Sequence, residues 1–104
     1  MKQFSVEVKV TQEHINKAIQ GDCGKCVVAL AMIDAVARLK KVNKSTIEVS
    51  TICLDTAVRI KNGTSFITTH PRNIYNLINN FDAGREIEPT SFTANFLEKN
   101  VNWA

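Results

Sequence analysis

Apolar and polar side chains alternate along residues 4–10, where phenylalanine and three valines are separated by serine, glutamate and lysine. A period of two residues is typical of a β-strand that buries one face. We therefore predict that the chain begins with a strand whose phenylalanine and valines point into the core.

Helical spacing replaces this alternation after Thr11. The hydroxyl of Thr11 can cap the N-terminus of a helix, and Ile15, Ala18 and Ile19 follow at a spacing of one helical turn. Gly21 ends the turn. The pattern predicts a short helix.

The next segment, residues 26–39, is apolar on nearly every side. Asp34 and Arg38 are its main polar exceptions, and Asp22 can cap its N-terminus. A helix that is apolar all round is normally buried on more than one face, so we expect this segment to be the central helix. It is shorter than the roughly 20 residues that a membrane-spanning helix needs.

A strand and a hairpin are predicted next. In the segment 47–53, every second residue lies on the same side of a predicted strand, with Glu48 and Ser50 on the other side. The dipeptide Asn62-Gly63 divides the segment 57–69, and it is preferred in type I′ turns because both central residues need a positive φ. A two-residue turn there would place Val58 opposite Ile67.

The C-terminal part contains one more helix and one more strand. Pro71 suits the first turn of the helix and Gly84 suits its end. The apolar positions between them, at i, i+3, i+4 and i+7, are Ile74, Leu77, Ile78 and Phe81. Apolar residues at 92, 94 and 96 predict a last strand, with Pro89 at an edge or an irregular entry.

The predicted order of elements is therefore β-α-α-β-β-β-α-β. It lacks the regular βαβ alternation of a doubly wound parallel sheet. We expect the α+β class, with a small antiparallel sheet and helices on one face. The length of 104 residues fits one domain, residues 1–104, with a single core.

Composition places the chain among ordinary globular proteins, with 44% apolar and 22% charged residues. No apolar stretch near the N-terminus is long enough for a signal peptide, so we expect a cytoplasmic location. The odd number of cysteines, three, fits poorly with a framework of disulfides. The thiols are better interpreted as core residues, metal ligands or redox groups.

A modest cluster of positive charge follows the central helix. The net charge is +3, and the cluster consists of Arg38, Lys40, Lys41 and Lys44. Such residues can contact phosphate, so a nucleic-acid-associated regulator is one alternative function. Lysines after a helix C-terminus also complement its dipole and keep the surface solvated, and this is the simpler interpretation.

The motif Gly21-Asp22-Cys23-Gly24-Lys25-Cys26 is the main candidate for chemistry. Two thiols separated by two residues can bind one zinc ion, which takes four tetrahedral ligands in structural sites. His14, on the preceding helix, is the best third ligand. His70, Cys53 and Asp22 compete for the fourth position, with His70 preferred. The expected cofactor is thus a structural zinc held by His14, Cys23, Cys26 and His70.

Two other interpretations of the same residues stay open. Cys26 begins an apolar helix and could simply pack in the core, as free cysteines often do. A Cys-x-x-Cys pair at a helix N-terminus could also support thiol redox chemistry, although such a motif normally follows a strand in a βαβ unit. The sequence contains no phosphate loop, nucleophile elbow or His-Glu-x-x-His motif, and we expect no enzymatic activity.

Two stretches of the chain carry a resemblance to a known family. The first is Val10-Thr11-Gln12-Glu13-His14-Ile15 together with the run from Gly21 to Ala31, and the second runs from Ile78 to Pro89, with Phe92 behind it. Together they resemble a family of small uncharacterised proteins carried by bacteriophages and mobile elements. Members often have proline after the second cysteine, where this chain has Val27. The resemblance implies a shared local site at His14, Cys23 and Cys26.

A small phage-borne protein of this kind is expected to inhibit a bacterial defence system, and an anti-CRISPR protein is the concrete example. Many anti-CRISPR proteins are acidic mimics of DNA, which this mildly basic chain does not resemble. The resemblance therefore implies a protein partner, such as a CRISPR effector nuclease, that is blocked at a protein surface or an allosteric site.

Overall fold

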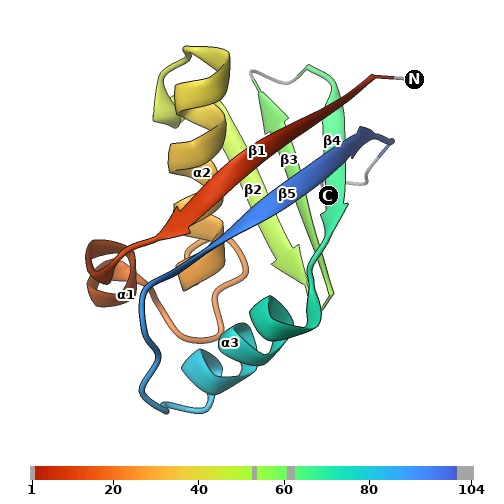
Figure 1. Cartoon of the computed structure of the whole chain (residues 1–104). Helices are drawn as coiled ribbons and strands as arrows, with labels where there is room; N and C mark the ends of the chain where they lie inside the picture. The colour runs from red at the N-terminus through yellow and green to blue at the C-terminus, as the bar shows by residue number, and fades with distance from the viewer. Residues whose placement is uncertain (1, 53, 61–62, 101–104) are drawn as a thin grey trace.

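A five-stranded antiparallel sheet curls around one central helix in the computed structural model, which describes residues 2–52, 54–60 and 63–100 (Figure 1). The elements are β1 (Gln3–Val10), α1 (Gln12–Lys17), α2 (Val27–Lys40), the 3₁₀ turn η1 (Lys44–Thr46), β2 (Ile47–Ile52), β3 (Asp55–Ile60), β4 (Ser65–Thr69), α3 (Arg72–Asp82) and β5 (Thr90–Glu98). The predicted α+β class and the predicted order of strands and helices are confirmed.

The sheet consists of two antiparallel ribbons in the strand order β1-β5-β4-β3-β2. β1 pairs with β5 along its whole length, and β2, β3 and β4 form a meander. The paired stretch between the two ribbons, formed by β4 and β5, is short, with Phe66 opposite Glu98 and Ile67 opposite Leu97. The ribbons therefore cross at a wide angle in Figure 1, and β1 and β2, at opposite edges of the sheet, both contact α2.

α2 is the core of the domain, as its apolar sequence predicts. Its buried residues come from every side of the helix: Val27, Val28, Ala29, Ala31, Met32, Ala35, Val36 and Ala37. The cap differs from the prediction. The sulfur of Cys26 accepts a hydrogen bond from the Ala29 N–H at 3.4 Å, whereas Asp22 accepts one from the Gly24 N–H at 2.9 Å. Asp22 therefore stabilises the preceding loop and Cys26 caps the helix.

Three phenylalanine rings fill the seam where the ribbons meet. The ring of Phe4 stacks on Phe96 at 4.9 Å and meets Phe66 edge-on at 5.0 Å. The ammonium group of Lys40, on the last turn of α2, lies 4.3 Å from the centre of the Phe4 ring. Aromatic packing thus joins β1, β4 and β5 where few backbone hydrogen bonds can do so.

The register of the β3–β4 hairpin differs from the prediction by one residue. Val58 lies opposite Phe66, not Ile67, and Ala57 lies opposite Ile67. Val58 is fully buried and Phe66 is 8% exposed, so both face α2. A slip of one residue would turn the phenylalanine away from the core, and its burial selects the longer loop. Asn62, on which the turn prediction rested, lies outside the described residues.

Helix ends lie close to the predicted positions. Thr11 caps α1 as expected, and α1 ends at Lys17, before Gly21 (φ 74°). Pro71 occupies the N-cap of α3 instead of its first turn, and Gly84 (φ 76°) follows the last turn. Among the described residues, no helix is long and apolar enough to cross a membrane.

We expect Phe96→Ala to lower the free energy of unfolding by about 3–5 kcal/mol, because the ring is fully buried at the seam between the two ribbons. Leu97→Ala is the matched control, because the Leu97 side chain, next to Phe96 in the strand, is 44% exposed. Its removal should lower the free energy of unfolding by less than about 1 kcal/mol. Urea unfolding followed by circular dichroism measures both. Equal losses would contradict the assigned faces of β5.

Candidate functional site

α1 is only six residues long, and its single buried side chain is His14. A helix this short is not stable by itself in water, so its position depends on contacts with the rest of the fold. Thr11 and His14 form a reciprocal cap: the Thr11 hydroxyl accepts from the His14 N–H at 3.3 Å, and His14 Nδ1 accepts from the Thr11 N–H at 3.0 Å. The start of the helix is thereby fixed.

The second ring nitrogen of His14 holds α1 against α2. Because Nδ1 accepts a hydrogen bond from a backbone N–H, the ring proton of the neutral side chain is on Nε2, and it is donated to the carboxylate of Asp34. Both ring nitrogens therefore have partners within the fold. His14 would have to give up one of these bonds to bind a metal or to act as a base.

Asp34 is also bound from its other side. Its Oδ1 lies 2.6 Å from the ammonium group of Lys44, in η1. Burial alone would raise the pKa of Asp34, but the hydrogen bonds from Lys44 and His14 outweigh burial, and the pKa lies below its usual range. The carboxylate thus stays ionised and ties α1, α2 and η1 together.

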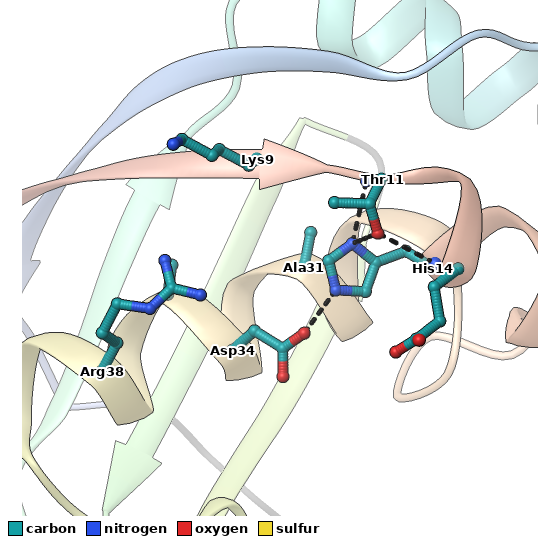
Figure 2. A pocket seen from close by; sticks show the side chains of 8 residues that line it. Lys9, Thr11, His14, Ala31, Asp34 and Arg38 are labelled. Atoms are coloured by element: carbon teal, nitrogen blue, oxygen red, sulfur yellow. Dashed lines mark hydrogen bonds and ion pairs between the residues drawn. The ribbon is translucent and has the colours of Figure 1, made fainter.

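A pocket of about 380 Å³ opens beside this cluster (Figure 2). Its lining residues are Lys9, Thr11, Glu13, His14, Ala31, Asp34, Ala35 and Arg38. Figure 2 shows the His14 ring between Thr11 and Asp34, with Lys9 on β1 and Arg38 on α2. The alanines form a shallow floor between the two elements. The geometry is that of a surface groove with charged residues of both signs.

The Cys-x-x-Cys loop has a structural role at the edge of the sheet. Cys23 is exposed and Cys26 is buried. The carbonyl of Cys23 accepts a hydrogen bond from the Thr51 N–H at 2.8 Å, so the loop covers part of the open edge of β2. Burial raises the pKa of the Cys26 thiol, which opposes the reactive thiolate that redox chemistry requires.

The four expected zinc ligands are not assembled into one site. No three of the His, Cys, Asp and Glu side chains in the described part of the chain lie close enough together to hold a metal ion. His14 is bound to Thr11 and Asp34, and Cys26 caps α2. Cys53, a competing candidate, lies outside the described residues. Zinc binding therefore stays a prediction, and the described residues do not bring together a set of ligands for it.

His70 belongs to a separate chain of buried polar groups. Its Nε2 lies 2.7 Å from the Thr56 hydroxyl, which lies 2.9 Å from the Thr51 hydroxyl. His70 Nδ1 is buried and has no hydrogen-bond partner among the described residues. Burial lowers the pKa of His70 against a smaller opposite effect of Asp55. The side chain is therefore neutral near pH 7.

A second pocket, of about 360 Å³, lies between α1 and the segment after α3. We call the surface around it the α1 end, and its lining residues are Gln12, Ile15, Gln20, Phe81, Gly84, Arg85, Glu86, Ile87 and Glu88. The phenylalanine and the two isoleucines pack against the core, while the charged residues are exposed. Composition and spacing alone do not indicate this surface, because its two halves are distant in the sequence.

The basic cluster is divided by the fold. Lys40 lies over the Phe4 ring and Lys44 pairs with Asp34, so two of its four cations have partners within the domain. The phenylalanine residues of the described strands point toward α2, and none forms a stacking surface on the other face of the sheet. These observations do not favour the nucleic-acid alternative.

Comparison of the chain with known protein families, curated proteins and solved structures found no match.

His14→Ala is expected to lower the free energy of unfolding by roughly 2–3 kcal/mol, because it removes a hydrogen bond to the partly buried carboxylate of Asp34 and the single buried side chain of α1. Amide protons of α1 should also exchange faster. Lys17→Ala is the control, since it removes only an exposed pair with Glu13 and should cost less than about 0.5 kcal/mol. If the amide protons of α1 exchange as slowly in the His14 variant as in the unmodified protein, the His14–Asp34 hydrogen bond does not hold α1 in place.

The free energy of unfolding is expected to fall when the pH is lowered from 7.5 to 5.5. His70 has a lowered pKa in the fold, so the unfolded chain takes up a proton near pH 6.5 that the folded chain does not. The contribution of the neutral His70 side chain to the free energy of unfolding is complete above that pH and is lost progressively below it. In His70→Gln the loss of unfolding free energy between pH 7.5 and 5.5 should be smaller by up to about 1.4 kcal/mol. Urea unfolding at both pH values measures the difference, and identical pH dependence in the two proteins would contradict it.

Proposed function

We propose that the protein acts by binding another protein, as a small inhibitor of a bacterial defence system of the anti-CRISPR kind. The observation that carries the proposal is the α1 end. Two of the three segments on which the family resemblance rests, residues 10–15 and 78–89, are far apart in the sequence and both line the α1 end. The other segment, residues 21–31, adjoins them through Gly21, whose N–H bonds the Asp82 carboxylate (Figure 1).

Specific hydrogen bonds hold these segments together. His14 of the first segment bonds Asp34 on α2, the helix that continues the second segment. The Gly21 N–H donates to the Asp82 carboxylate at 3.1 Å and joins the second segment to the third. Such hydrogen bonds restrict the movement of the three segments before a partner binds, and this restriction reduces the entropy lost on binding.

The chemical character of the α1 end also suits a protein partner. The half-buried Ile15 and Ile87 provide an apolar centre above the buried Phe81, and exposed charged residues surround it. This arrangement of an apolar centre and a polar rim is typical of protein–protein interfaces. Ile19, which precedes Gln20 of the pocket in the chain, is 49% exposed and extends the apolar area.

The charge of the chain favours one mode of inhibition. With a net charge of +3 the protein does not resemble an acidic mimic of DNA. We therefore propose that it covers a protein surface or an allosteric site on a CRISPR effector nuclease. In this proposal the tie between α1 and α2 comes from His14 and Asp34, so binding does not depend on zinc.

The proposal predicts that expression of the protein restores plaque formation by a targeted phage in bacteria that carry a susceptible CRISPR–Cas system. The test uses a panel of strains, each with one CRISPR–Cas type and a guide against the same phage. In a responding strain, Glu86→Lys/Glu88→Lys should lower plaque formation by at least about tenfold, because it reverses the charge of the rim.

Glu48→Lys is the matched control, since it reverses an exposed charge on β2, outside the α1 end, where Glu48 pairs with Arg59 of the neighbouring strand β3. It should retain inhibition. Full activity of the rim variant, or equal loss in the control, would contradict the assignment of the α1 end. The absence of protection in every strain would contradict the anti-CRISPR function itself.

A further inference from the structure

The two edges of the sheet are treated differently by the fold. The edge of β2 is partly covered by the Cys-x-x-Cys loop through the bond between Thr51 and Cys23. The edge of β1 has no strand or loop paired with it among the described residues. Unpaired edges are normally shortened, bulged or covered, because they can pair with another chain. β1 is instead eight residues long and pairs with β5 without a bulge.

The hydrogen-bond pattern identifies the groups that β1 presents at this edge. The Lys2 carbonyl accepts from the Glu98 N–H at 2.9 Å, so the even-numbered residues form the bonds to β5. In an antiparallel pair these residues alternate with residues whose N–H and C=O point the other way. The backbone groups of Gln3, Ser5, Glu7 and Lys9 therefore point to the free edge.

The charges along β1 are arranged symmetrically about Val8. Glu7 and Lys9 flank it and form an exposed ion pair with each other at 3.8 Å, and their neighbours on β5 are the uncharged Thr93 and Ser91. A second β1 that runs antiparallel about a two-fold axis at Val8 would place Glu7 of each copy opposite Lys9 of the other. The same register joins odd residues to odd residues, as the outward backbone groups require.

We propose that the free edge of β1 pairs with β1 of a second copy, so that the five strands of each copy form one continuous sheet in a two-fold symmetric dimer. The two central pairs, Glu7 with Lys9 and Lys9 with Glu7, exchange backbone hydrogen bonds and carry opposite charges. Self-complementarity of this kind is what a two-fold interface requires.

The groove beside the edge has room for the second copy. The pocket between β1 and α2 has a floor of Ala31 and Ala35, whose side chains are small. A strand added to β1 would lie over the mouth of this pocket. The proposed dimer uses this side of the molecule and not the α1 end, so it is independent of the proposed function.

Light scattering after size exclusion, over a range of protein concentrations, tests the proposal first. We expect the average mass to rise with concentration from that of one chain, 11.6 kDa, toward twice that value. Glu7→Lys and Lys9→Glu, which place like charges opposite each other, should each weaken association by about tenfold or more. The double exchange Glu7→Lys/Lys9→Glu should restore it to within about threefold, and Glu86→Lys should leave it unchanged.

Hydrogen exchange of the unmodified protein gives a second test that needs no variant. The amides of Glu7 and Lys9 should become protected as the concentration rises, while the amides of Val6 and Val8, bonded to β5, stay protected throughout. A monomer at every concentration would overturn the proposal. So would a dimer whose association does not respond to the single variants or is not restored by the double exchange.

Discussion

Burial of α2 is the constraint on which the rest of the structure depends. The helix is apolar on nearly all sides, and a flat sheet could cover only one of them. The sheet instead divides into two ribbons that meet at a short contact between β4 and β5, so that both of its edge strands reach the same helix. The phenylalanine cluster at the seam replaces the backbone hydrogen bonds that a continuous sheet would have there.

Asp34 is the main interruption of this apolar helix, and its charge organises the neighbouring surface. The Asp34 carboxylate is partly withdrawn from solvent, and two partners stabilise its charge: Lys44 after the helix and His14 before it. The hydrogen bond between His14 and Asp34 determines where the short α1 lies, because His14 is the single buried side chain of that helix. The α1 end and the groove along β1 both depend on that placement, so a requirement of the core leads directly to the proposed recognition surface.

Cys23 and Cys26, the two cysteines of the motif, both have structural roles in the fold. In the structure, Cys26 caps α2 through its sulfur and Cys23 covers the edge of β2 through its carbonyl. These roles use the position of the loop rather than thiol reactivity. The consequence, within the part of the chain that the structure describes, is an asymmetric sheet, with the β2 edge partly covered and the β1 edge without a paired strand or loop.

Local patterns in the sequence determined the elements of this protein, because period, caps and turn residues act over a few neighbouring positions. They predicted the order of strands and helices, the burial of α2 and the cap at Thr11. The tertiary structure alone decided which distant groups meet: Asp34 with His14, Cys23 with Thr51, and Val58 with Phe66 instead of Ile67. His14 illustrates the reason, since the same imidazole can bind a metal or a carboxylate, and only the packing of α1 on α2 places the carboxylate beside it.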